Sequence, residues 1–178
     1  MKSQENITSH RSIAVVTWLA LTWLVTSMPA VAQNAYITNQ GIYPNFSNTV
    51  TVIDTTTNKV VTTVDVGLAP AGVAVTPDGS RAYVTNLNNT VSIIDTATNA
   101  VSATISVGKG PLGIAFTPDG SKAYVANELD HTVSVIAIPS NTVVGTIHVG
   151  TSPIAFGIFI LPNFSHPPLN PHSSKPQR

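Results

Sequence analysis

The sequence of 178 residues contains no cysteine, and this absence excludes disulfide bonds, thiol catalysis, cysteine-ligated zinc and a lipid anchor attached to cysteine. Charged residues make up only 9% of the chain, against roughly 25% in an average soluble protein. The 8 basic residues balance the 8 acidic ones, so no basic surface for nucleic acid is indicated. Aromatic residues are also scarce, at 6%. The chain relies instead on valine, threonine and isoleucine, which favour β-strands, and on 13 prolines and 11 glycines, which favour turns.

Long apolar runs are missing except for one near the N-terminus. Lys2 and Arg11 precede an apolar stretch over residues 13–28, and a small-residue Ala-Val-Ala pattern follows at residues 30–32. This order is typical of a signal peptide, so we expect residues 1–32 to be removed and the chain to be exported to the periplasm, the cell surface or the medium. An uncleaved anchor is the alternative, since about 20 apolar residues can span a bilayer. After cleavage no membrane span is expected.

An internal repeat of 41 or 42 residues organises the rest of the chain. TPDGSRAYVTN at residues 76–86 recurs as TPDGSKAYVAN at residues 117–127, and TVSIID at residues 90–95 recurs as TVSVIA at residues 132–137. A partial earlier copy begins with AYITN at residues 35–39. Its following loop, residues 40–48, is six residues longer than the equivalent loop of the next copy.

Each repeat is predicted to form short strands separated by turns. In the second copy the strands are predicted at residues 72–75, 82–85, 91–94 and 101–107. Proline, aspartate and glycine in the TPDG string supply the backbone angles and side-chain bonds of a tight turn. Four antiparallel strands with a period near 40 residues are the blade of a β-propeller, so the sequence predicts an all-β fold.

The AYVTN and AYVAN strings, the TPDGS turn, the TVSIIDTATN hairpin and the VGKGPLGIAFTPDG crossover resemble the YVTN family of β-propeller repeats. The resemblance covers residues 35–160, so we expect a propeller domain over residues 33–160 and an extended, proline-rich tail over residues 161–178. It implies a surface-layer or cell-envelope protein. The wider superfamily also holds lactonase-like and cytochrome-associated propellers.

When the strands of each blade are numbered outward from the propeller axis, the sequence predicts a permuted strand order for the chain. The chain begins with the second strand of a blade at residues 35–38, and residues 154–160 match a lone innermost strand, which totals twelve strands or three blades. Closed propellers have four to eight blades. The alternatives are an open three-blade arc, a homodimer that exchanges clasp strands to make a six-bladed ring, or a shortened relic of a longer propeller. The arc and the relic are slightly favoured, because no interface distinct from ordinary blade contacts is evident.

Few residues are candidates for chemistry. Glu128, Asp130 and His131 cluster in one loop and form a weak candidate for a metal or acid–base site, since the other copies lack equivalent charges. The Asp-Gly pairs of the TPDG strings are explained by their turns. The tyrosines that recur at positions 36, 83 and 124 are interpreted as core packing. No catalytic motif is present, and no cofactor is predicted.

The preferred function is an exported, non-catalytic binding module for an unknown protein or a cell-surface polymer. Loops on a rigid scaffold usually carry recognition, so the long loop at residues 40–48, with Tyr43 and Phe46, is the predicted contact. The alternatives are a lactonase-like hydrolase, an accessory to a periplasmic redox enzyme, or a truncated copy without function.

Overall fold

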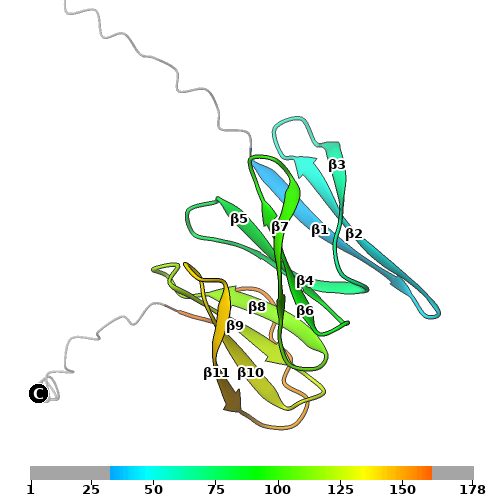
Figure 1. Cartoon of the computed structure of the whole chain (residues 1–178). Helices are drawn as coiled ribbons and strands as arrows, with labels where there is room; N and C mark the ends of the chain where they lie inside the picture. Colours follow the sequence, from blue (N-terminus) through cyan, green and yellow to red (C-terminus); the bar gives the residue numbers. More distant parts are fainter. Residues whose placement is uncertain (1–32, 162–178) are drawn as a thin grey trace, which may run out of the picture. The chain divides into compact units, whose positions relative to one another are not determined.

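The computed structural model describes residues 33–161, so the predicted signal peptide and the tail beyond Leu161 lie outside it. The described chain consists of eleven strands in three antiparallel sheets (Figure 1). The predicted all-β fold of propeller blades is thereby confirmed. None of the described residues belongs to a helix that could cross a membrane.

Each sheet is one blade with its strands in chain order. The first blade contains β1 (Asn34–Ile42), β2 (Asn45–Asp54) and β3 (Lys59–Asp65). The second contains β4 (Pro70–Val75), β5 (Arg81–Asn86), β6 (Thr90–Asp95) and β7 (Ala100–Ser106). The third contains β8 (Pro111–Phe116), β9 (Lys122–Asn127), β10 (Thr132–Ala137) and β11 (Thr142–His148). Within residues 33–161 the first blade therefore has three strands and no equivalent of the innermost strand of the other two, as predicted.

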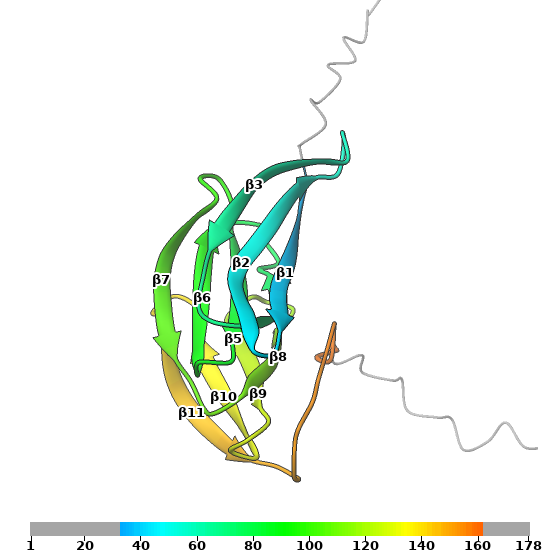
Figure 2. The same cartoon turned by 90° about the vertical axis from the view of Figure 1, so that its right-hand side faces the viewer.

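The core lies between the blades, which stack face to face (Figure 2). Successive residues of a strand point to opposite faces of its sheet, so the middle blade contributes to two cores. Tyr83 and Ile93 pack toward the third blade, against Val125 and its neighbours. Val84 and Ile94 pack toward the first blade. Alternation along β5 and β6 thus places one apolar set in each joint between blades.

Two hydrogen bonds recur at the joints between blades. Tyr36 donates its hydroxyl proton to Asn99 Oδ1 of the next blade at 2.8 Å, and Tyr83 donates in the same way to Asn141 Oδ1. Both tyrosine rings are buried, which confirms the prediction of core packing for these two. Burial raises the pKa of Tyr83 above its ordinary value, because ionisation would place a charge away from water. The second bond involves threonine: Thr38 and Thr85 donate to backbone carbonyls of the following blade.

The crossovers between blades are held by a glycine beside an asparagine. Gly67 leads into the second blade, and a Cβ added there would lie 2.5 Å from the side chain of Asn86. Gly108 leads into the third blade and meets Asn127 in the same way. The backbone N–H of Gly67 donates to Ser92 Oγ at 3.3 Å. Only glycine allows this close approach of a backbone to the asparagine side chain.

The TPDG turns form as their residue types predict. Asp78 accepts hydrogen bonds from the Thr76 hydroxyl at 2.6 Å and from the Ser80 backbone N–H at 3.0 Å. These bonds stabilise the charged carboxylate and hold the pKa of Asp78 at about 2. Asp119 makes the equivalent bonds in the third blade, and its pKa is also about 2. The interpretation of these aspartates as turn residues is confirmed.

The prediction of a strand at residues 154–160 is wrong. This segment has no regular secondary structure, so the described chain has eleven strands and not twelve. It nevertheless lies where an innermost strand would begin. On the innermost strand of the second blade, a Cβ added to Gly72 would overlap the carbonyl oxygen of Leu112 on the innermost strand of the third blade. On the innermost strand of the third blade, a Cβ added to Gly113 would overlap the carbonyl oxygen of Ala155 in the same way. An innermost strand pairs with the strand that follows it, as β4 does with β5. None of the described strands pairs with residues 154–160, and β1 belongs to the blade at the other end of the stack.

Candidate interaction site at the first hairpin

Residues 40–48 do not form the long loop that the sequence predicts. β1 and β2 continue pairing beyond Asn39 and Thr49, with Gly41 opposite Phe46 and Ile42 opposite Asn45. The register shifts between Asn39 and Gly41, where an irregularity in β1 allows the ladder to resume. The inserted residues therefore lengthen a β-hairpin, which extends beyond the end of β3 (Figure 1).

Gly41 is required by the backbone of this hairpin. Its φ of 73° lies in the left-handed region, which glycine adopts at little cost. A Cβ at this position would lie 2.6 Å from the backbone of Asn45 and of Ser47. Gly41 therefore allows the two strands to approach closely at the end of the hairpin.

The end of the hairpin presents apolar side chains to solvent. Ile42 is 80% exposed, Tyr43 83% and Phe46 41%. The rings of Tyr43 and Phe46 contact each other edge to face, with their centroids 6.2 Å apart. Residues 40–48 contain no ionisable group other than Tyr43. We refer to Ile42, Tyr43 and Phe46 as the hairpin tip.

The base of the hairpin is fixed to the remainder of the domain. Asn39 Nδ2 donates to the hydroxyls of Thr49 at 3.1 Å and Thr51 at 2.8 Å, which joins the two strands through their side chains. The carbonyl of Ser47 accepts the N–H of Ala69 at 2.8 Å from the crossover to the second blade. The hairpin tip is therefore carried by an anchored ladder, which reduces the entropy lost on binding.

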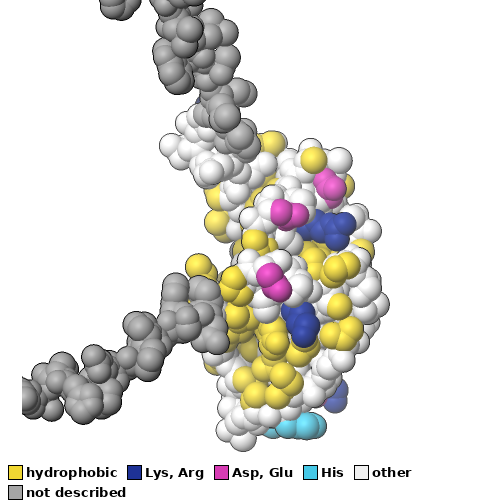
Figure 3. Space-filling model, turned by 90° about the vertical axis from the view of Figure 1, so that its left-hand side faces the viewer, with side chains coloured by type: hydrophobic (Ala, Val, Ile, Leu, Met, Phe, Trp, Pro, Cys, Tyr) yellow, Lys and Arg dark blue, Asp and Glu magenta, His cyan; other side chains and the backbone are white. Residues whose placement is uncertain are grey.

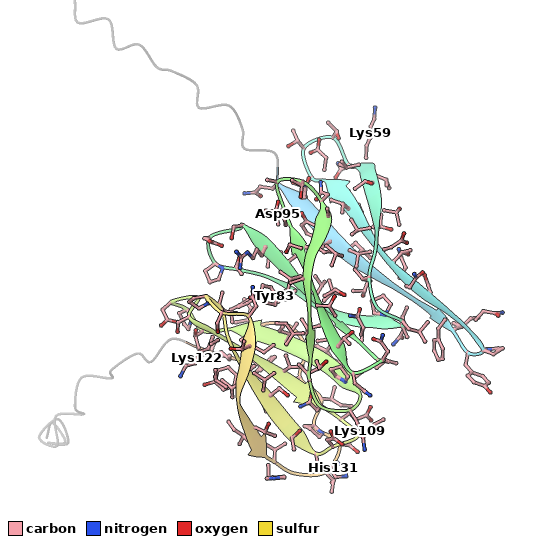
Figure 4. The ribbon with its side chains drawn as sticks, in the orientation of Figure 1. Lys59, Tyr83, Asp95, Lys109, Lys122 and His131 are labelled. Carbon is pink, nitrogen blue, oxygen red and sulfur yellow. The ribbon has the colours of Figure 1, made fainter. Side chains whose placement is uncertain are left out.

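The charged loop at residues 128–131 is held by contacts within the third blade and its crossover. Asp130 Oδ2 accepts the backbone N–H of Lys109 at 2.8 Å, and His131 Nδ1 accepts the backbone N–H of Ser152 at 3.0 Å. The backbone N–H of Glu128 donates to Gly110 at 2.9 Å. Lys109 and His131 lie at the same end of the third blade (Figure 4). These contacts give Asp130 and His131 a role in shaping the crossovers.

Within residues 33–161 no three acidic or histidine side chains gather closely enough to hold a metal ion. Charged residues make up only 9% of the whole chain. One face of the described domain shows hydrophobic and neutral side chains, with a few Asp or Glu side chains beside Lys or Arg (Figure 3). The most prominent feature that sequence reasoning missed is the pairing of tyrosine with asparagine across blades. Both residue types recur with the period of the repeat, and this shared period is the signal that could have revealed it.

The family model described as "Lactonase, 7-bladed beta-propeller" matches residues 73–151, which span the second and third blades. No curated protein sequence matches the chain significantly. The sequence match and the blades agree on a β-propeller family.

Solved structures with similar folds come from proteins of different kinds. Hydrazine synthase from Kuenenia stuttgartiensis is 34% identical with a TM-score of 0.61, over 66% of this chain and 33% of that one. AztD from Citrobacter koseri is 20% identical with a TM-score of 0.53, over 61% of this chain and 32% of that one. The dihydro-heme d1 dehydrogenase NirN, in complex with DHE, is 19% identical with a TM-score of 0.55, over 64% and 24%. The chain thus spans a third or less of the length of these three structures.

Proposed function

Because the chain is built from the blades of a β-propeller, we propose that it is an exported binding module that recognises a protein through the hairpin tip. The observation that carries this proposal is the exposed group of Ile42, Tyr43 and Phe46 on an anchored ladder. Aromatic side chains on rigid supports are typical of the residues that dominate protein interfaces. Export is supported by the pattern of residues 1–32.

A protein partner suits the chemistry of the hairpin tip. The tip is apolar and contains no Asp, Glu, Lys, Arg or His, so it favours an apolar surface over a strongly charged polymer. The Tyr43 hydroxyl can add a hydrogen bond at the rim of such an interface. The partner is expected to offer an apolar depression that accepts Tyr43 and Phe46 together.

The test is binding of the fluorescently labelled mature chain to cell envelopes of the source organism. We expect saturable binding that disappears when the envelopes are first treated with protease. The double variant Tyr43→Ser/Phe46→Ser should bind at least tenfold more weakly, because two aromatic contacts at an interface centre commonly exceed about 2 kcal/mol. Binding that survives protease treatment, or that is unchanged in the double variant, contradicts the proposal.

A matched control is Val144→Thr on the outer strand β11. Val144 is 58% exposed, so this substitution also removes an exposed apolar group, but far from the hairpin tip. We expect its binding to equal that of the wild type. An equal loss of binding affinity in the control and in the double variant would indicate nonspecific hydrophobic adsorption instead of recognition by the hairpin tip.

The match to the lactonase model favours a second candidate, a lactonase-like hydrolase. Lactone hydrolysis by the purified chain should be assayed with and without a divalent metal. Glu128 belongs to the most acidic loop of the third blade, so Glu128→Gln is the variant to compare. Hydrolysis that depends on Glu128 and on metal would support an enzyme, whereas no hydrolysis under either condition supports the binding module.

A further inference from the structure

Each joint between blades takes a donor from one blade and an acceptor from the next, and the described chain leaves one of each unused. Tyr36 and Tyr83 donate to Asn99 and Asn141, but the third blade's Tyr124 has no hydrogen-bond partner among the described residues. At the opposite end of the stack, Asn58 occupies the turn position of Asn99 and Asn141. It has the same backbone conformation, with a φ of 53° against 52° and 53°.

The crossovers leave a second unused pair at the same two ends. The G-x-x-P pattern of the first two crossovers recurs at residues 150–153, yet a Cβ on Gly150 would meet nothing within 4 Å. In the first blade Asn39 bonds Thr49 and Thr51 just as Asn86 bonds Thr90 and Ser92. No crossover glycine lies against Asn39 within the described residues.

The apolar faces at the two ends are equivalent to faces that are paired inside the molecule. Ile37 corresponds by the repeat to Val84, which is fully buried between the first and second blades, but Ile37 is 49% exposed. Ile147 corresponds to Ile105, which is 8% exposed between the second and third blades, but Ile147 is 47% exposed. Each end of the stack therefore presents half of an ordinary joint.

We propose that two copies of the chain associate head to tail, with the third blade of each joined to the first blade of the other. In this joint Tyr124 donates to Asn58 of the second copy, and Gly150 packs beside Asn39. Residues 154–160, already beside β8, then lie next to β1 of the second copy and supply the strand that its blade lacks. Two such joints close a ring of six blades, within the range of four to eight that closed propellers have.

One contact inside the chain must be broken for this association. Phe159, Ile160 and Leu161 line a depression together with Tyr124 and Ile147 on the open face of the third blade. Phe159 is 37% exposed and Leu161 74% exposed there, so these residues cover the face less completely than a blade does. A second copy would displace them and gain an apolar joint of the kind seen between the paired blades.

The test uses the mature chain in analytical ultracentrifugation over the micromolar range. The wild type should have the mass of two chains, while Ile37→Arg and Ile147→Arg should each be monomeric, because each blocks one half of every joint. Mixing the two variants should give an open species of two chains held by one intact joint, since Ile37→Arg retains the third-blade half and Ile147→Arg retains the first-blade half. The second joint of this species would bring both arginines together and should stay open.

Other outcomes overturn the proposal. A monomeric wild type would show that residues 159–161 or solvent cover the faces. A dimer that persists in Ile37→Arg would show that like faces pair, and an open-ended series of masses would show that the ring does not close.

Gentler variants keep the test valid if the arginine variants fail to fold. Tyr124→Phe removes a single hydroxyl, and Gly150→Ala adds a single methyl group where the isolated chain has open space. Each should weaken association about tenfold and leave the circular dichroism spectrum of the monomer unchanged. Leu129→Ser, on an exposed rim residue outside both faces, is the matched control and should associate like the wild type. Unchanged association in both Tyr124→Phe and Gly150→Ala contradicts the joint as described.

Discussion

Removing the hydroxyl of Tyr83 tests whether the tyrosine–asparagine bonds stabilise the joints. Tyr83 is fully buried, its ring contacts Phe116 edge to face at 5.1 Å, and its hydroxyl donates to Asn141. Tyr83→Phe keeps the ring contacts but leaves Asn141 Oδ1 without its partner. Loss of this partly buried hydrogen bond, with the acceptor left behind, should cost about 1–2 kcal/mol. For a domain of this size the midpoint of thermal unfolding should fall by about 3–6 °C.

The assay is urea unfolding followed by circular dichroism at the lowest practical protein concentration, with the equivalent tyrosines as controls. Tyr36→Phe should also destabilise, because Tyr36 makes the same bond to Asn99. Tyr124→Phe should have almost no effect on the free energy of unfolding of the monomer. Equal midpoints for wild type and Tyr83→Phe, or an equal loss in Tyr124→Phe, would refute the reasoning.

Three further variants test the turns, a crossover and the core. Asp78 and Asp119 have folded pKa values of about 2, below the ordinary 3.8, so their stabilisation is complete above pH 3.8 and is lost as the pH falls toward 2. The double variant Asp78→Asn/Asp119→Asn should therefore show a flatter acid dependence of its urea midpoint. Gly67→Ala drives a methyl group into Asn86 and should cost about 1–3 kcal/mol in urea unfolding. Ile94→Ala opens a cavity between two blades and should cost about 2–5 kcal/mol, measured in the same way.

Most of the fold could be predicted from the sequence because the repeat is locally encoded. Alternating apolar residues define each strand, and the TPDG strings define turns through bonds that aspartate makes with residues two positions away. Such contacts depend on neighbours in the chain alone. The three-stranded first blade of the described chain was predictable for the same reason, since the first recognisable copy of the repeat begins with a second strand.

The two errors have a common physical cause. Whether residues 154–160 form a strand depends on a partner strand elsewhere in space, and the local pattern carries no information about that partner. Residues 40–48 were predicted to be a loop because they interrupt the repeat, but a glycine at position 41 allows the ladder to continue through an irregularity. In both segments the outcome depends on backbone pairing that apolar alternation does not specify.

The recurrence of tyrosine and asparagine also explains why no separate dimer interface is evident in the sequence. At each joint the donor groups of one blade pair with the acceptor groups of the next blade. An open stack therefore has an unused set of donor groups at one end and an unused set of acceptor groups at the other. Here the unused sets, on Tyr124 and Gly150 at one end and Asn58 and Asn39 at the other, have the same register as the paired ones. An interface between copies therefore needs no residues beyond those that already join the blades. The hairpin tip lies outside these sets, so the proposed recognition and the proposed self-association can be tested separately.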